Sequence, residues 1–339
     1  MKPLYMILLA LVLFFFCFEG LVMVFVPASL TVGVQGPLIL RVGLVVGIVL
    51  FAFLAFRRRN LVSLFFAFGL VALVFASPLW IGSGIQGRFV GAYYYGWYTQ
   101  EDFAGMLDQP LQGAYDSTDL TVLRQQLKWA GEAEIDFLAL SGFIEDAPYL
   151  DLVWQNAEAM FHENEERDYP VQLCFMLEPR SFDGLAGMAE HVWQNYAETE
   201  AYFCYQGKPL LFIFDGYIPS DLPLYVERLQ SFTVRTTVDS PYSSIESQTT
   251  YVGDVVAVMP GFERPDWPDV YVPRDGGQHY REQWQTALVL SAANLNRPLI
   301  VMVTSWNEYW ENTHIEASVN YGDAYLNMTK EYAMQLKQK

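Results

Sequence analysis

Two glutamates near the end of the chain have the spacing to act on one chemical bond. Glu308 and Glu311 lie three residues apart, directly after the apolar and β-branched run 299–303. A run of this kind is typical of a buried strand, which would deliver the side chains that follow it into a cleft. Paired carboxylates are the recurring acid and base of glycosidic bond cleavage. We expect these two to be the catalytic pair; a solvated loop or a structural pair of salt-bridged acids is the alternative.

Polar and aromatic residues also follow other strand-like segments. Trp97 and Tyr98 follow the first such segment, Glu178 follows the third, Asp215 follows the fourth, and the run 260–264 follows a later one. In a (β/α) barrel the carboxyl ends of all strands meet at one face, and that face carries the active site. The sequence therefore predicts one site assembled from several strand ends.

Strand-like and helix-like segments alternate through the second part of the chain, which is typical of a parallel sheet covered by helices. The predicted fold is α/β, a (β/α)8 TIM barrel over residues 87–339. We expect an eighth strand within residues 243–252. The other predicted strands are 89–95, 135–140, 171–177, 210–214, 232–238, 255–259 and 299–303. The predicted helices are 120–134, 150–166, 185–199, 222–230, 280–293 and 320–337.

Residues 1–86 have a different composition and are nearly all apolar. Three runs, about 4–26, 38–56 and 61–81, are each near the ~20 residues that cross a bilayer as a helix. We interpret this part as a membrane anchor of three transmembrane helices. The basic turn 57–60 favours the cytoplasm, which places the catalytic domain on the extracytoplasmic side. A cleaved signal peptide in place of the first span would leave that side unchanged.

Two features of the anchor invite a functional interpretation. Glu19 lies within the first apolar run, where a carboxylate is a candidate for a relay, although an interfacial position is the simpler interpretation. The run 82–87 matches G-x-G-x-x-G literally, but a nucleotide site needs a strand before it and a helix after it. We expect a flexible linker there.

The charge of the second part excludes several classes of partner. From residue 89 onward 37 acidic side chains face 14 basic ones, a net charge of −23. Such a domain repels nucleic acid and anionic polymers. Solubility is the simplest reason for the charge, and a preference for neutral or cationic substrates is the alternative. The four histidines, His162, His191, His279 and His314, lack any metal-binding spacing, so we expect no metal or other cofactor. Whether Cys174 and Cys204 form a disulfide stays open.

Several motifs, in order along the chain, resemble the endo-α-mannosidase family, glycoside hydrolase family 99 (GH99). Related GH99-like domains occur in polysaccharide-biosynthesis proteins of the WbsX type. The likeness extends from about residue 89 to residue 318. The motifs are AYYYGWY (92–98), GAYDSTD (113–119), FLALS (137–141), LEP (177–179), GKPLLFIFD (207–215), PGF (260–262) and SWNEYWENTHIE (305–316).

This resemblance implies a TIM barrel that cleaves α-mannosides with retention and without a metal. The first glutamate of the motif, Glu308 here, would take the proton of the sugar 2-hydroxyl, so that a 1,2-anhydro sugar forms. The second, Glu311, would protonate the leaving oxygen and then activate water. A polysaccharide or oligosaccharide is the expected substrate. The residues expected to bind it are Tyr94, Tyr95, Trp97, Glu178, Asp215, Arg274, Tyr280, Trp306 and Asn307.

The chain departs from the family pattern at three places. The family usually has His-Glu-Gly where this chain has Trp310-Glu311-Asn312, Gly142 stands where the family has an aromatic residue, and a His-rich loop is absent. Three functions therefore stay open: a membrane-anchored glycoside hydrolase, a protein of surface-polysaccharide biosynthesis that transfers sugars, and a glycan-binding protein without catalysis. Release of reducing sugar distinguishes the first from the others.

Overall fold

The computed structural model describes residues 87–143, 150–179, 181–214, 226–237, 251–252, 254–293 and 299–338. The three expected membrane spans, Glu19 and residues 82–86 of the expected linker lie outside these residues. Among the residues that are described, no helix is both long and apolar enough to cross a membrane.

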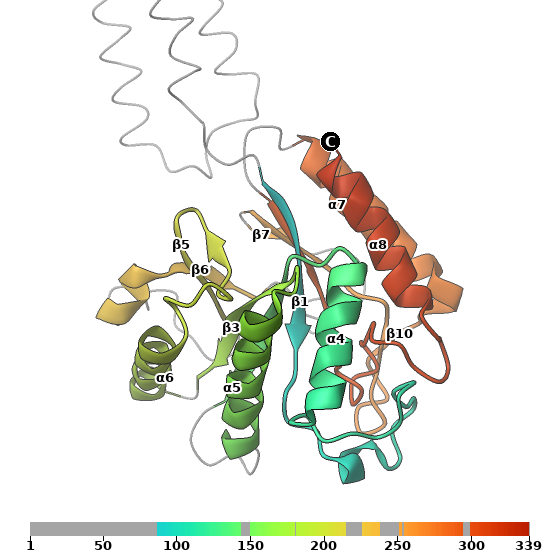
Figure 1. Ribbon diagram of the computed structural model, residues 1–339. Helices are drawn as coiled ribbons and strands as arrows, with labels where there is room; N and C mark the ends of the chain where they lie inside the picture. Colours follow the sequence, from blue (N-terminus) through green and yellow to red (C-terminus); the bar gives the residue numbers. More distant parts are fainter. Residues whose placement is uncertain are drawn as a thin grey trace, which may run out of the picture. The chain divides into compact units, whose positions relative to one another are not determined.

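A parallel sheet of seven strands forms the centre of the described domain (Figure 1). Its hydrogen-bonded order is β6-β5-β3-β2-β1-β11-β8. These seven are the seven strands expected from the sequence, with ends that differ from the expected ones by at most three residues. Their bounds are β1 Arg88–Tyr94, β2 Phe137–Phe143, β3 Gln172–Glu178, β5 Lys208–Ile213, β6 Thr233–Thr236, β8 Val255–Val258 and β11 Leu299–Val303.

The expectation of eight parallel strands needs a correction. The end of the segment in which we expected the eighth strand is β7, Tyr251–Val252, and it runs antiparallel to β8 as a hairpin. Within the described residues the sheet is thus a curled half-barrel, open between β6 and β7. Three further short strands complete the assignment: β4 Cys204–Tyr205 against β5, and β9 Phe262–Glu263 paired with β10 Tyr271–Val272.

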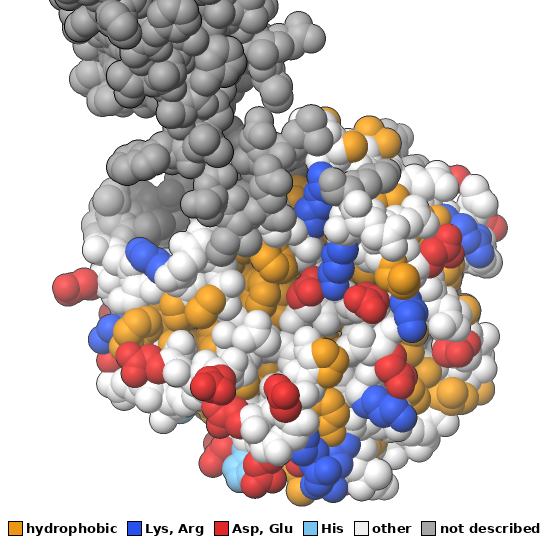
Figure 2. Space-filling model, turned by 45° about the horizontal axis from the view of Figure 1, so that its top comes forward, with side chains coloured by type: hydrophobic (Ala, Val, Ile, Leu, Met, Phe, Trp, Pro, Cys, Tyr) orange, Lys and Arg blue, Asp and Glu red, His pale blue; other side chains and the backbone are white. Residues whose placement is uncertain are grey.

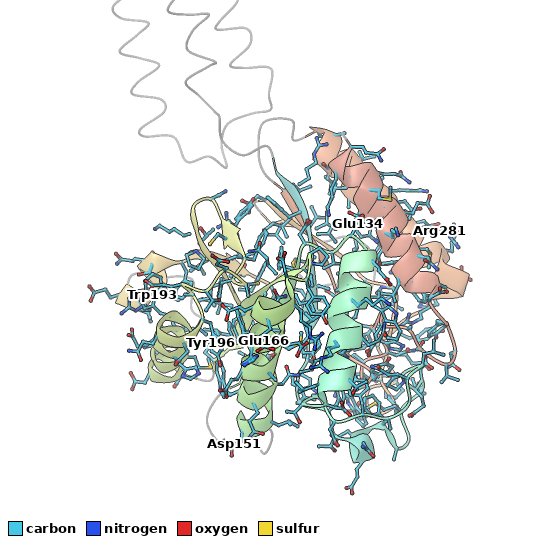
Figure 3. The ribbon with its side chains drawn as sticks, in the orientation of Figure 1. Glu134, Asp151, Glu166, Trp193, Tyr196 and Arg281 are labelled. Carbon is cyan, nitrogen blue, oxygen red and sulfur yellow. The ribbon has the colours of Figure 1, made fainter. Side chains whose placement is uncertain are left out.

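The helices cover the sheet where the apolar periodicity predicted them. They are α4 Leu120–Glu132, α5 Leu150–Arg167, α6 Phe182–Asn195, α7 Gln278–Ala293 and α8 Ala324–Lys337. Short 3-10 helices lie at η2 Gln100–Phe103, η4 Glu227–Ser231 and η5 Asp275–Gly277; η4 is the described end of the helix expected at 222–230. Helices α4, α5 and α6 stand beside one another, and α7 packs on α8 (Figure 1). In Figure 3, Glu166 marks α5, Trp193 marks α6 and Arg281 marks α7.

Ring contacts show which side of the sheet is concave. Tyr93 of β1 and Phe212 of β5 meet edge to face at 5.7 Å although two strands separate β1 from β5, so the sheet curls around them. On β3, Phe175 packs instead against Phe161 of α5, at 5.7 Å, and so faces the helices. Because side chains alternate along a strand, Glu178 faces the concave side with Tyr93 and Phe212.

The concave side is closely packed near the start of β1. A Cβ atom at Gly91 would lie 2.4 Å from the ring of Phe137 and 2.6 Å from the sulfur of Met302. Only glycine fits between the neighbouring strands at this point. The interior of the curled sheet is therefore filled at the level of Gly91.

Charged side chains are spread over the surface of the domain. On the face shown in Figure 2, acidic side chains are scattered among Lys and Arg side chains. Cys174 is buried in β3 and Cys204 is exposed in β4; both are free thiols, so the disulfide left open above is not formed.

Candidate active site

The segment that follows β11 is bound to the neighbouring strand ends through its backbone. All five residues of β11 are buried. The Trp306 amide then donates to the Tyr93 carbonyl of β1 at 2.7 Å, and the Ser305 and Thr313 backbones pair within the segment at 2.9 Å. Backbone hydrogen bonds alone therefore fix the turn that carries the two glutamates to the sheet.

Asn307 completes this attachment. Its Oδ1 accepts from the Tyr95 amide and its Nδ2 donates to the Tyr95 carbonyl, both at 2.8 Å. Asn307 has no exposed surface, so these bonds replace water for both backbone groups. The Asn307 carboxamide thus makes the two hydrogen bonds that a neighbouring strand would otherwise make to Tyr95, beyond the end of β1.

Glu308 is almost completely buried, with 5% of its surface exposed. Its Oε1 accepts from the Tyr98 hydroxyl at 2.7 Å and from the Trp310 amide at 2.9 Å. Burial, the neighbouring Glu311 and, to a smaller extent, Glu178 raise the pKa of Glu308 to about 8, although both hydrogen bonds oppose the rise. The surroundings of Glu308 therefore favour its neutral form.

Glu311 lies at the exposed border of the site. Arg264, from the segment after β8, approaches its Oε1 at 3.4 Å and also binds Asp266 at 2.7 Å. The Glu311 carbonyl accepts from the Glu263 amide of β9 at 3.0 Å. The hairpin β9–β10 and the turn after β11 thus hold Glu311 from two sides.

Glu178 is the third carboxyl of the group. It ends β3 on the concave side, and Ser141 of β2 donates to its Oε1 at 2.5 Å. Burial, opposed by that bond and increased by the charge of Glu311, raises the pKa of Glu178 to about 7. The three carboxyls influence one another, so the carboxyl ends of β3 and β11 share one electrostatic cluster.

Two of the aromatic residues expected to bind a sugar lie next to this cluster. Tyr95 follows β1 and is 7% exposed; Trp97 is partly buried, and the two rings are 4.5 Å apart. Trp97 lies 6.0 Å from the ring of Tyr98, whose hydroxyl binds Glu308. Contact of Tyr95 and Trp97 with a sugar stays a prediction that this placement favours.

Tyr94 requires a correction. It points to the convex side of the sheet, where its hydroxyl donates to Gln126 of α4 at 3.0 Å and accepts from Asn156 of α5 at 3.1 Å. Alternation along β1 explains the difference, since Tyr93 and Tyr95 face the concave side and the residue between them cannot. Tyr94 therefore binds the helical layer to the sheet and does not face the site.

Tyr280 requires a correction for a similar reason. Its side chain has no exposed surface, and its hydroxyl pairs with Thr329 of α8 at 2.8 Å. It contributes to the packing of α7 on α8, in the layer outside the sheet. The family motif places Tyr280 near Arg274 in the sequence, but the start of α7 turns its side chain toward α8.

Arg274 supports the segment after β11 from behind. Its Nη2 donates to the carbonyls of Asn312 and His314, at 2.9 and 2.7 Å, and its guanidinium lies over the ring of Tyr321 at 4.3 Å. Arg274 is 7% exposed and Trp306 is completely buried. Direct contact of Arg274, Trp306 or Asn307 with a sugar stays a prediction that their burial disfavours. Asp215 lies outside the described residues.

Asn312 occupies the position where the resembling family has glycine. Its φ is +50°, in the left-handed region, which asparagine tolerates better than most residues other than glycine. Its carbonyl is held by Arg274. The backbone of the turn therefore has the conformation that a glycine would allow, although the side chain is new.

Tyr98, Ser141 and Glu316 belong to the site region, but the sequence assigned none of them a role, although Tyr98 was noted after a predicted strand. Glu316, 2% exposed, accepts from Gln112, Tyr115 and Gln126 at distances from 2.8 to 3.2 Å. Tyr98 had a usable signal, because it lies four residues after the end of β1. Ser141 and Glu316 are the last residues of two quoted motifs, but their hydrogen-bond partners lie far away in the sequence, so their roles could not be predicted. Within the described residues no group of three or more His, Cys, Asp or Glu side chains is arranged to hold a metal.

Comparisons with known proteins agree with this geometry. Residues 101–237 match the family model of glycosyl hydrolase family 99. Two structures of the GH99 endo-alpha-mannosidase from Bacteroides thetaiotaomicron, one in complex with bis-tris propane, share the fold. Their TM-scores are 0.58 and 0.57 at 19% and 18% sequence identity, and each match covers 74% of this chain and 97% of the other. A search among curated proteins found no match. The chain is therefore similar to glycoside hydrolase family 99 over residues 101–237, and its described domain shares the fold of these endo-alpha-mannosidase structures.

Proposed function

We propose that the protein is a membrane-anchored retaining glycoside hydrolase that cleaves α-mannoside linkages within a polysaccharide. The observation that carries the proposal is the position of Glu308. It is a buried carboxyl, oriented by Tyr98 and grouped with Glu311 and Glu178 at the carboxyl ends of the strands. The GH99-like fold supports a glycosidase-type function at this face.

The proposed reaction has two steps. Ionised Glu308 accepts the proton of the sugar 2-hydroxyl, the 2-oxygen bonds to the anomeric carbon, and a 1,2-anhydro sugar forms. The glycosidic bond breaks in the same step, and Glu311 gives its proton to the leaving oxygen. Glu311 then takes a proton from water, whose oxygen opens the anhydro ring at the anomeric carbon, and Glu308 returns its proton to the 2-oxygen. Two inversions at the anomeric carbon give net retention.

The roles of the other residues follow from exposure. We assign Glu178 to the sugar hydroxyls and Trp97 to the apolar face of the sugar ring, because both lie at the cluster and are partly exposed. Tyr95 is buried against Trp97 and keeps its expected contact with the sugar as part of the proposal. Asn307, Trp306 and Arg274 support the turn that carries the catalytic pair. Asp215 keeps its expected role as a sugar ligand.

The decisive experiment uses the full chain in detergent. The protein is incubated with α-mannan and α-mannosyl oligosaccharides, and the products are followed by NMR beside the double variant Glu308→Gln/Glu311→Gln. We expect an α-configured first product from the unchanged protein alone. A β-configured first product, or equal cleavage by the double variant, would contradict the proposal. Saturable binding without cleavage in both proteins would instead support a glycan-binding protein.

Membrane anchoring and orientation are part of the proposal and rest on residues 1–86 of the sequence. Apolar runs of this length are expected to keep the protein in the membrane fraction after an alkaline carbonate wash. Protease added outside intact cells should cleave the domain 87–339 if it faces away from the cytoplasm. Release by carbonate, or protection of the domain until the cells are opened, would refute the corresponding part.

A further inference from the structure

Three aromatic side chains are strongly exposed in the described part of the chain, and all three follow carboxyl ends of the parallel strands. Phe182 is 43% exposed and begins α6, after β3. Tyr271 is 53% exposed in β10, after β8. Trp310 is 43% exposed in the turn after β11. We call these three residues the aromatic rim.

Each rim residue is close in the chain, or in backbone pairing, to a different carboxyl of the cluster. The Trp310 amide donates to Glu308 at 2.9 Å. Tyr271 pairs with Glu263 across the β9–β10 hairpin, and the Glu263 amide donates to the Glu311 carbonyl at 3.0 Å. Phe182 lies four residues after Glu178. Trp310 and Tyr271 are thus connected through backbone hydrogen bonds to the turn that carries Glu308 and Glu311, and Phe182 follows the strand that ends at Glu178.

The backbone beneath the rim is hydrogen-bonded. The Ser181 side chain caps α6 by accepting from the Gly184 amide at 3.0 Å, which fixes the start of the helix at Phe182. The turn at Trp310 is held between Glu308 and the Asn312 carbonyl, which Arg274 binds. Exposed rings on a fixed backbone lose little conformational entropy when a ligand covers them, and this lowers the cost of binding.

The chemistry of the rim selects one kind of ligand. Flat aromatic faces contact the C–H faces of sugar rings, and their exposure beside a polar cluster is typical of a binding surface. A domain with a net charge of −23 repels anionic polymers. A neutral glycan fits both conditions, and three exposed aromatic residues from separate segments suit a glycan of several sugar units better than a single sugar.

We propose that the aromatic rim binds the sugar units that flank the bond held at the carboxyl cluster, so that the ligand is an extended neutral glycan. Trp310, which replaces the histidine usual in the family motif, is the main residue that determines specificity. The proposal rests on the function given above for the position of the cleaved bond and for the choice of α-mannan as the probe.

The test measures binding apart from catalysis. The full chain carrying Glu308→Gln/Glu311→Gln is titrated with α-mannan and with α-mannosyl oligosaccharides of increasing length. We expect Trp310→Ala to weaken binding of the polymer about tenfold, the loss typical of removing a central aromatic contact. Phe182→Ala and Tyr271→Ala should each cause a smaller loss. The loss should shrink as the oligosaccharide shortens, and Trp310→Phe should restore most of the affinity.

Matched controls come from the outer helices. Val289 on α7 and Met334 on α8 are 69% and 41% exposed, so Val289→Ala and Met334→Ala remove exposed apolar side chains on the outer helices. Unchanged binding by Trp310→Ala, an equal loss in the controls, or a loss independent of glycan length would overturn the proposal. Failure of the parent protein to bind α-mannan would overturn it as well.

The outcomes separate the rim from the proposed reaction. If the unchanged chain binds α-mannan through the rim but does not cleave it, the rim stands and the hydrolase proposal fails. If it cleaves α-mannan and an aryl α-mannoside, and Trp310→Ala acts on both as the unchanged chain does, the hydrolase stands and the rim fails.

Discussion

Glu308 and Glu316 lie eight residues apart in one segment, and both are buried, yet their surroundings differ. Glu316 accepts from three neutral side chains, the carboxamides of Gln112 and Gln126 and the hydroxyl of Tyr115. Glu308 accepts from one side chain and one amide, and the charges of Glu311 and Glu178 act on it. Burial raises both pKa values, to about 7 for Glu316 and about 8 for Glu308.

The difference shows that burial alone does not identify a catalytic carboxyl. A carboxyl surrounded by neutral hydrogen-bond donors has its hydrogen bonds made, and a change in its protonation meets no neighbouring charge. A carboxyl crowded by like charges, with few donors, gains or loses a proton in response to its neighbours. We therefore expect substitutions at the two positions to affect different properties of the protein.

The largest expected effect is on catalysis at Glu308. Glu308→Gln removes the proposed base, so cleavage of both α-mannan and aryl α-mannosides should fall by about a thousandfold or more, within the range known for essential acid–base groups. Rates from reducing-sugar release and from the aryl chromophore measure the change. The matched control is Glu166→Gln on the exposed surface of α5, which should keep full activity (Figure 3). Full activity of Glu308→Gln would exclude the assigned base.

A smaller and more selective effect is expected at Glu311. Glu311→Gln should reduce cleavage of α-mannan by about a hundredfold or more, because a sugar is a poor leaving group that needs a proton. Formation of the anhydro sugar from an aryl mannoside with an activated leaving group should be nearly unchanged, and this appears as a burst of aryl alcohol in stopped-flow absorbance. Equal losses with both substrates would move the acid to another residue.

Glu316 should affect stability and its pH dependence. The pKa of Glu316 is raised in the folded state, so between pH about 4.5 and about 7 the folded state keeps a proton that the unfolded state has lost. This group therefore makes the protein less stable as pH rises, by about 1.4 kcal/mol per pH unit in that range. Glu316→Gln resembles the protonated form and should remove this slope, measured by denaturant unfolding at several pH values. An unchanged slope would assign the proton elsewhere.

The smallest expected effect is at Tyr98, and it tests how Glu308 is tuned. The Tyr98 hydroxyl stabilises the charged carboxylate, so Tyr98→Phe should raise the pKa of Glu308 further. Because the base must be ionised, kcat/KM for an activated aryl mannoside should rise with pH toward a plateau above about 8 in the unchanged protein. The variant should reach its plateau at a pH higher by less than about one unit, the size expected for one hydrogen bond to a charged group. A shift to lower pH would contradict the assignment.

Much of the fold could be predicted because its signals are local. The apolar spacing of residues 120–134 and 280–293 gave helices within two residues of α4 and α7, and the β-branched run 299–303 coincides with β11. The strand expected within residues 243–252 was the least certain part of the predicted fold, because a short apolar run does not distinguish a parallel strand from one arm of a hairpin. Only pairing with β8 shows the direction of β7.

The site was harder to predict because it depends on which side a residue faces. The convergence of Glu308, Glu311 and Glu178 could be predicted because they lie at or after the ends of strands, and strand ends converge in this fold. Tyr94 could not be separated from Tyr93 and Tyr95 in a run of three tyrosines until the register of β1 was known. Asn307 and Arg274 have side chains suited to sugars, but their partners are backbone groups that no sequence pattern reveals.

The hydrogen bonds to Glu308 have a stereochemical consequence. Tyr98 and Trp310 both donate to Oε1, whereas Oε2 has no hydrogen-bond partner within the part of the chain that the structure describes. The Tyr309 amide donates to the Tyr98 hydroxyl at 3.1 Å, which leaves that hydroxyl's single proton directed at Oε1. The two carboxyl oxygens of Glu308 are therefore chemically distinct before a sugar binds. In the proposed reaction Oε2 exchanges protons with the sugar 2-hydroxyl, so the fold determines which oxygen of Glu308 reacts as well as which residue.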